Sequence, residues 1–281
     1  MNLPVHVTLL VLVAAVMHAS WNAIAKSAAV TLLDISTMAV AAAAACLLAV
    51  GFLPFPERES WPWLAASVLL HFIYFVALVG AYDWGDLSHA YPLMRGLAPM
   101  LVAVAGFVLL DDRLTPAMWA GVALISGGVL LPFWLGPAKF GRPGKGTLFA
   151  LFNAVVIASY SLVDGMGTRL SAGPVAYCLW LFIFDAVPIT LLALARHGHA
   201  VWPYMRGRWR PGALGGLLTL GSYGIVLWAM TRAPIAAVAA LRETSVIFAA
   251  IIGSVLLREG FGPPRIAGAV LVACGVAALR L

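Results

Sequence analysis

Residues 109–131 read LLDDRLTPAMWAGVALISGGVLL, and residues 256–279 read LLREGFGPPRIAGAVLVACGVAAL. The two stretches share a Leu-Leu pair, an acidic residue, a proline and regularly spaced glycines. A shift of 147 residues superimposes these features and pairs Pro116 with Pro263, Gly121 with Gly268 and Gly128 with Gly275. Similarity at a fixed interval is typical of a duplicated structural unit, so the chain is predicted to contain two copies of one fold.

The repeat extends outward from these stretches. The same shift pairs Arg95 with Arg242, and a shift of 139 residues pairs Ser20 with Ser159 and Trp21 with Tyr160. The copies are therefore predicted to occupy residues 1–139 and 140–281.

The composition indicates that lipid is the solvent of this chain. Of its 281 residues, 63% are hydrophobic and 10% are charged, whereas soluble domains contain roughly 25% charged residues. The net charge of +6 comes from Lys and Arg scattered over short loops, which is not the basic face of a nucleic-acid-binding protein. The three cysteines lie in apolar runs without metal-ligand or disulfide spacing.

The apolar runs predict about ten membrane-spanning helices, because each helix needs roughly 20 residues to cross a bilayer. The predicted spans are Leu3–Ala25, Leu33–Leu53, Trp61–Tyr82, Ala90–Leu110, Pro116–Leu135, Thr147–Gly167, Pro174–Ala195, Pro211–Thr231, Ala236–Leu257 and Pro263–Leu281. Five crossings per copy place the second copy in the opposite orientation. The predicted fold is thus an all-α integral membrane protein with ten transmembrane helices in two inverted five-helix repeats, an architecture found in many secondary transporters.

Four motifs give the chain a resemblance to a known family: HASWNAIAK at residues 18–26, AYPLMRGLAP at residues 90–99, and the two paired stretches quoted first. With these, the sequence resembles the drug/metabolite transporter superfamily, specifically its EamA-type branch of ten helices. The resemblance implies a carrier of small metabolites and does not define the solute, since one fold serves many functions. It also implies cytoplasmic termini, whereas Lys and Arg are more frequent in the predicted loops of the opposite face, which the positive-inside rule places in the cytoplasm.

The sequence therefore predicts a secondary transporter, an exporter or permease, for an amino-acid-like or organic-anion-like solute, working by alternating access in the bacterial inner membrane. A flippase for lipids or lipid-linked headgroups is one alternative. An integral-membrane enzyme is a weaker one, because the chain has no HExxH pair, nucleophile elbow or CxxC cluster. We expect no catalytic residue, metal, cofactor or nucleic acid. The expected partners are the solute and the lipid bilayer. The sequence leaves open whether the chain forms a homodimer.

Ionisable residues inside the spans are the first functional candidates, because each costs roughly 2.5–3.5 kcal/mol at a helix centre. They are His18, His71, Arg95, Asp164, Asp185, Arg242 and Glu243. The repeat places Arg95 and Arg242 at equivalent depths, so both are predicted to bind an acidic group of the solute. Their structural alternative is permanent pairing with Asp185 or Glu243. Pro92 and Pro99 flank Arg95 and predict a kink there.

A polar stripe on the first span is the next candidate. His18, Trp21 and Asn22 recur at helical spacing and share one face, and Tyr160 and Asp164 repeat the stripe in the second copy. The stripe could instead join helices by hydrogen bonds. Tyr91 and Tyr223 complete the predicted solute-binding set of Arg95, Arg242, His18, Trp21, Asn22, Tyr91, Tyr160 and Tyr223.

Proton coupling is predicted to rest on Asp185, Glu243 and His18, because burial raises the pKa of a carboxyl group and histidine changes its charge near neutral pH. Asp185, Glu243 and Asp164 form the set expected to couple an ion or to compensate the arginine charges. His71 with Tyr74, and Tyr223 with Trp228, could also add aromatic walls to the solute path.

Overall fold

The fold is taken from a computed structural model of the chain, which describes residues 3–84, 87–135, 144–171, 173–256 and 262–281. The first copy forms α1 (Val5–Lys26), α2 (Thr31–Val50), α3 (Trp61–Asp83), α4 (Leu87–Leu110) and α5 (Pro116–Leu135). The second copy forms α6 (Lys145–Arg169), α7 (Pro174–His197), α9 (Trp209–Met230), α10 (Ile235–Arg242), α11 (Ser245–Leu256) and α12 (Pro263–Ala278). A short helix, α8 (Val201–Gly207), joins α7 to α9.

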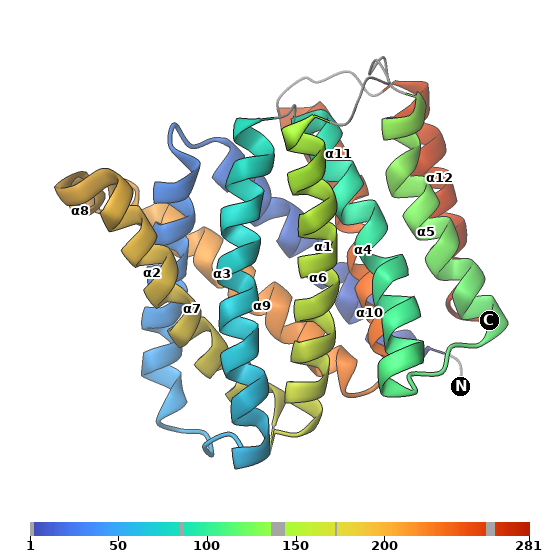
Figure 1. Cartoon of the computed structure of the whole chain (residues 1–281), viewed down its shortest axis with the longest axis horizontal. Helices are drawn as coiled ribbons and strands as arrows, with labels where there is room; N and C mark the ends of the chain where they lie inside the picture. Colours follow the sequence, from blue (N-terminus) through green and yellow to red (C-terminus); the bar gives the residue numbers. More distant parts are fainter. Residues whose placement is uncertain (1–2, 85–86, 136–143, 172, 257–261) are drawn as a thin grey trace.

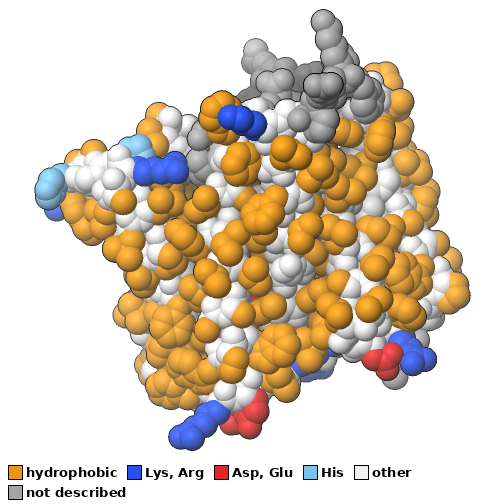
Figure 2. All heavy atoms as spheres, viewed as in Figure 1, with side chains coloured by type: hydrophobic (Ala, Val, Ile, Leu, Met, Phe, Trp, Pro, Cys, Tyr) orange, Lys and Arg blue, Asp and Glu red, His pale blue; other side chains and the backbone are white. Residues whose placement is uncertain are grey.

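The helices have the length and composition of membrane spans. Nine helical segments of the described chain are long and apolar enough to cross a bilayer, with α10 and α11 counted within one segment, and α12 adds a shorter apolar helix. Figure 2 shows a face covered by hydrophobic side chains, with Lys, Arg, Asp and Glu gathered mainly at its upper and lower edges. The predicted all-α membrane fold of two five-helix repeats is confirmed.

The two copies are interleaved: several helices of one copy pack directly on helices of the other. α1 contacts α9 while α3 contacts α6, and these are equivalent pairs with the copies exchanged. α2 packs on its counterpart α7, and α5 packs on its counterpart α12. Both termini lie at the same face of the bundle (Figure 1), as an even number of crossings requires.

Glycines bring α5 and α12 into close contact. A Cβ on Gly128 would lie 2.6 Å from the carbonyl oxygen of Gly268, and a Cβ on Gly121 would lie 2.9 Å from that of Gly275. The 147-residue repeat relates Gly121 to Gly268 and Gly128 to Gly275, so each glycine contacts the counterpart of the other. That exchange is the signature of a pseudo-twofold axis through the crossing.

The ninth span, predicted as one helix, is broken in the middle. α10 ends at Arg242, α11 begins at Ser245, and the backbone N–H groups of Glu243 and Thr244 donate to carbonyls only three residues earlier. The Thr244 hydroxyl also donates to the Leu241 carbonyl oxygen at 2.8 Å, which satisfies a group near the break. α4 instead continues as one helix through Pro92 and Pro99. The predicted end of the ninth span, Leu257, lies outside the described residues.

Charged side chains hold the first turn of α10 at the face of the termini. The Ile235 backbone N–H donates to Asp112 Oδ2 at 2.7 Å, and a carboxylate at a helix N-terminus is favourable. Arg169 donates from Nε to the Met230 carbonyl at 2.9 Å and lies 3.6 Å from Asp112 Oδ1. α10 is thus fixed to the α4–α5 connection of the other copy.

A second charged contact holds α2 at the opposite face. Asp34, fully buried in the first turn of α2, accepts two hydrogen bonds from Arg208, at 2.8 and 2.9 Å. The Tyr204 hydroxyl donates to the same carboxylate at 3.2 Å. The α7–α9 connection, which projects from the bundle in Figure 1, is anchored there.

The glycine crossing makes a testable prediction. Gly128→Ala should lower the free energy of unfolding by about 1–3 kcal/mol, the usual cost of overpacking, because the new methyl group would collide with backbone atoms. Gly127→Ala is the matched control, since nothing lies within 4 Å of a Cβ at that position, and it should be neutral or stabilising. Thermal unfolding in detergent compares the two variants, and equal melting temperatures would contradict the crossing.

Candidate functional site

A cavity lies inside the bundle and reaches toward the face opposite the termini. It encloses about 120 Å³ that the centre of a water molecule can occupy. α1 starts beside the N-terminus, and the cavity is lined by His18 and Trp21 from the second half of α1 and by residues between Ile35 and Ala42 of α2. Its aromatic walls are Trp21, Tyr74, Phe75, Tyr160, Phe182 and Tyr223. Its ionisable groups are His18, His71, Arg95, Asp185 and Arg242.

One wall of the cavity carries two arginines that share a single carboxylate. Arg95 Nε lies 2.8 Å from Glu243 Oε2, and Arg242 Nε lies 3.8 Å from Glu243 Oε1. All three side chains are at most 3% exposed. This arginine cluster, defined as Arg95, Arg242 and Glu243, therefore carries one positive charge in excess. The sequence left open whether the arginines pair with Asp185 or with Glu243. In the structure both contact Glu243, whereas Asp185 contacts His71.

Donors of the arginine cluster are left without hydrogen bonds. The short contact between Arg95 and Glu243 is not aligned as a hydrogen bond, and Arg95 Nε, Arg95 Nη2 and Arg242 Nε have no hydrogen-bond acceptor within the described parts of the chain. Arg242 Nη2 donates to the Tyr160 hydroxyl over 3.4 Å. Buried charged donors cost free energy unless they are paired, so these groups favour an anionic oxygen as ligand.

The single carboxylate follows from a sequence difference between the two copies. Arg242 is followed by Glu243, but its counterpart Arg95 is followed by Gly96. A Cβ at Gly96 would lie 2.6 Å from Leu130 Cγ, so α5 leaves no room for a second carboxylate there. The break after Arg242 gives Glu243 a position between the two guanidinium groups.

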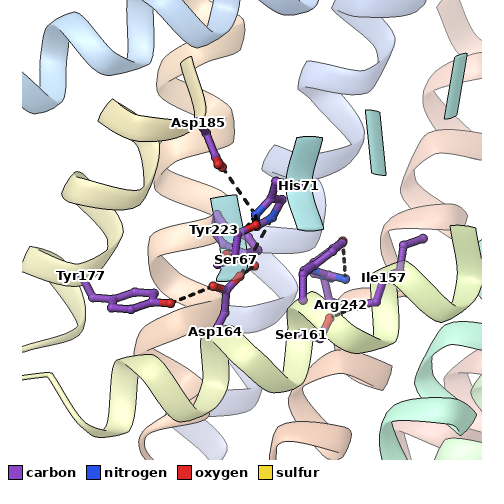
Figure 3. A network of polar contacts seen from close by, with 10 residues as sticks. Ser67, His71, Ile157, Ser161, Asp164, Tyr177, Asp185, Tyr223 and Arg242 are labelled. Carbon is purple, nitrogen blue, oxygen red and sulfur yellow. Dashed lines mark hydrogen bonds and ion pairs between the residues drawn. The ribbon is translucent and has the colours of Figure 1, made fainter. Parts of the chain in front are cut away.

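His71 and Asp185, which also line the cavity, form with the buried Asp164 a second ionisable group, defined here as the histidine group of His71, Asp164 and Asp185 (Figure 3). His71 Nδ1 lies 3.5 Å from Asp185 Oδ2, and His71 Nε2 lies 4.0 Å from Asp164 Oδ2. Asp164 is fully buried and accepts hydrogen bonds from the hydroxyls of Tyr177, at 3.1 Å, and Tyr223. The His71 ring stacks on Tyr160 with the ring centres 4.5 Å apart.

Only part of the predicted polar stripe on α1 faces the cavity. His18 and Trp21 line the cavity, and the Trp21 indole N–H donates to His18 Nδ1 at 3.3 Å. Asn22 instead donates to the His18 carbonyl oxygen at 2.8 Å, so its amide is turned onto its own helix. Tyr91 packs in an apolar cluster with Ala90 and Met94.

Two contributors were not placed in the predicted site. His71 was a candidate as an ionisable residue inside a span and as part of an aromatic wall, without a partner, and Tyr177 was not considered. Their partners lie on other helices, so no spacing within one helix could have pointed to them; the buried hydroxyl of Tyr177, which needs an acceptor, was the available signal.

The arginine cluster makes a prediction about stability. Glu243→Gln keeps the side-chain shape but leaves two buried cations without a counter-ion, which should lower the free energy of unfolding by roughly 3–5 kcal/mol. Asp111→Asn is the control, because Asp111 pairs with Arg113 where both side chains are more than 70% exposed. Such pairs contribute little. A Glu243→Gln protein that unfolds at the parent temperature would contradict the shared-carboxylate arrangement.

Comparisons with known proteins concern the family and the fold of the chain. The sequence profile of the EamA-like transporter family matches residues 7–134 and again residues 144–281. No curated protein matches the chain. One solved structure, described only as the crystal structure of a protein, is 19% identical with a TM-score of 0.69, and the match covers 97% of this chain and 96% of that one. That likeness concerns the fold alone.

Proposed function

Because the chain belongs to the EamA-like transporter family, we propose that it is a secondary transporter for a small solute with an acidic group, either an organic anion or an amino-acid-like zwitterion. The family makes the chain a multi-pass membrane transporter of small solutes. The solute class rests on one observation: Arg95 and Arg242, which both line the cavity, share a single carboxylate, and each has a buried N–H donor with no hydrogen-bond acceptor among the described residues. We place the protein in the bacterial inner membrane.

Guanidinium groups suit this ligand. Each presents a planar fork of N–H groups, always charged, that can bind a carboxylate or phosphonate through two parallel hydrogen bonds. With one positive charge in excess, the arginine cluster would become neutral when a single anionic group binds. Aromatic side chains around it would contact the apolar part of the solute.

Alternating access is the proposed mechanism. Its support is the exchanged packing of the two repeats around a cavity inside the bundle, as in other transporters built from inverted repeats. On the side of the termini, Asp112 and Arg169 tie α10 to the other copy, so that side would have to open for the solute to pass. Single-channel conductance in a planar bilayer would contradict this mechanism.

The flippase alternative has less support. An apolar groove outside the bundle runs between α4 and α6, lined by residues such as Leu101, Val104 and Val155. Its lining contains no charged side chain and shares no residue with the cavity. Reconstitution with labelled lipid on one arm and labelled soluble anions on the other separates the two functions.

The arginines are tested by conservative substitution. A stabilisation screen with organic acids, amino acids, amines and phosphonates first identifies a solute, since a ligand of the folded state raises the unfolding temperature. Arg95→Lys and Arg242→Lys should then each weaken its binding about tenfold or more, because a hydrogen bond to a charged group contributes about 1.5–3 kcal/mol. Arg113→Lys, at an exposed position, should bind like the parent.

The same screen can overturn the proposal. Parent-like affinity in both cavity variants, or a preferred solute that is a cation without an acidic group, would make the arginines structural.

A further inference from the structure

We propose that the histidine group of His71, Asp164 and Asp185 is a proton-binding site, separate from the arginine cluster, in which one proton makes His71 bridge the two carboxylates. The assignment of this proton to transport rests on the proposed function. The site itself rests on contacts among three helices, α3, α6 and α7.

The hydrogen bonds of His71 define the state of its ring. Nδ1 lies 3.1 Å from both the carbonyl oxygen and the hydroxyl of Ser67, and 3.5 Å from Asp185 Oδ2. The carbonyl and the carboxylate only accept, whereas the hydroxyl can accept or donate, so we assign the proton of the neutral ring to Nδ1. Nε2 of that neutral ring then has a lone pair directed toward Asp164 Oδ2, 4.0 Å away. Two acceptors face each other there, and no hydrogen bond joins them.

One proton converts this unfavourable contact into a bond. On Nε2 it makes the ring an imidazolium that donates to Asp164 from Nε2 and faces Asp185 from Nδ1. Hydrogen bonds between charged partners span about 2.7–2.9 Å, so the ring and Asp164 would approach each other. The group needs this proton because neither aspartate has an Arg or Lys within ion-pairing distance among the residues described.

The neighbours of the group are mostly neutral. Its titratable and charged neighbours are Tyr160 on α6, Tyr177 and Cys178 on α7, Tyr223 on α9 and Arg242 on α10. The hydroxyls of Tyr177 and Tyr223 donate to Asp164, which steadies one carboxylate without neutralising it. Asp185 Oδ1 is buried and has no hydrogen-bond partner in the part of the chain that the structure describes. Asp185 also lines the cavity, which gives the proton a route from cavity water.

Tyr160 connects this group to the arginine cluster. One face of its ring stacks on His71, and its hydroxyl accepts from Arg242. A proton at His71 adds positive charge to the cavity, so it should strengthen the binding of an anionic group at the arginines. By linkage, the anionic group strengthens proton binding by the same factor, typically 5- to 150-fold. A solute and a proton are therefore expected to travel together.

The proton is its own probe, so the site can be tested without a solute. Ring-nitrogen NMR shifts of the purified full chain, with isotope-labelled histidine, report tautomer and charge; His71→Gln assigns the His71 signals. In the parent, His71 should change from the neutral Nδ1–H tautomer to imidazolium as the pH falls from about 8 to about 5. In Asp164→Asn and in Asp185→Asn, half-protonation of His71 should require a proton concentration about tenfold higher or more than in the parent, because the variant lacks one negative charge beside the ring. Asp111→Asn should behave like the parent.

Either of two outcomes would overturn the proton site. One is a His71 ring that stays neutral over the whole range in the parent, and the other is unchanged protonation in both aspartate variants. Solute binding by the arginine variants at constant pH is measured separately. Loss of binding there with an inert His71 would reject this inference alone, and parent-like binding would reject the proposed function while leaving the His71 titration readable.

Discussion

The contact between Arg95 and Glu243 is the constraint on which the rest of the bundle depends. A guanidinium group buried in a membrane protein requires a counter-ion, and this one is supplied by the other copy of the repeat, across the interface of the two halves. Glu243 can serve both arginines because the ninth span breaks directly after Arg242. The break and this contact together fix α10 between its Asp112 cap and the arginine cluster, and they leave one excess positive charge at the cavity.

The inverted repeat places the two arginines at equivalent positions, and the sequence differences between the copies determine the charge of the cavity. Glycines at the α5–α12 crossing let the two copies approach around one pseudo-twofold axis, and the arginines occupy equivalent positions about it. The copies differ where the charges are balanced: Glu243 has Gly96 as its counterpart. Likewise, α4 runs through its prolines whereas the equivalent span is broken without one. An exactly symmetric protein would bury two carboxylates with two arginines and leave no charge for a solute.

Much of the fold could be predicted from the sequence, because span length and the fixed repeat interval are properties of single segments. The position of the ninth-span break could not, since the break residues Glu243 and Thr244 lie in an apolar run without Gly or Pro. The sequence marked Arg95, Arg242 and Tyr160 through the repeat, and the structure brings them together. It gave no sign that Asp185 faces His71, or that Asn22 bonds its own helix, because these contacts depend on how separate helices are rotated against each other.

A structure of the protein with its solute bound would test the central claim most directly. The account predicts that the acidic group of the solute lies within hydrogen-bond distance of both Arg95 and Arg242, accepting from N–H groups that have no acceptor among the described residues. It further predicts that Glu243 remains between the two guanidinium groups. A solute bound elsewhere in the cavity, with both arginines contacting Glu243 alone, would contradict it.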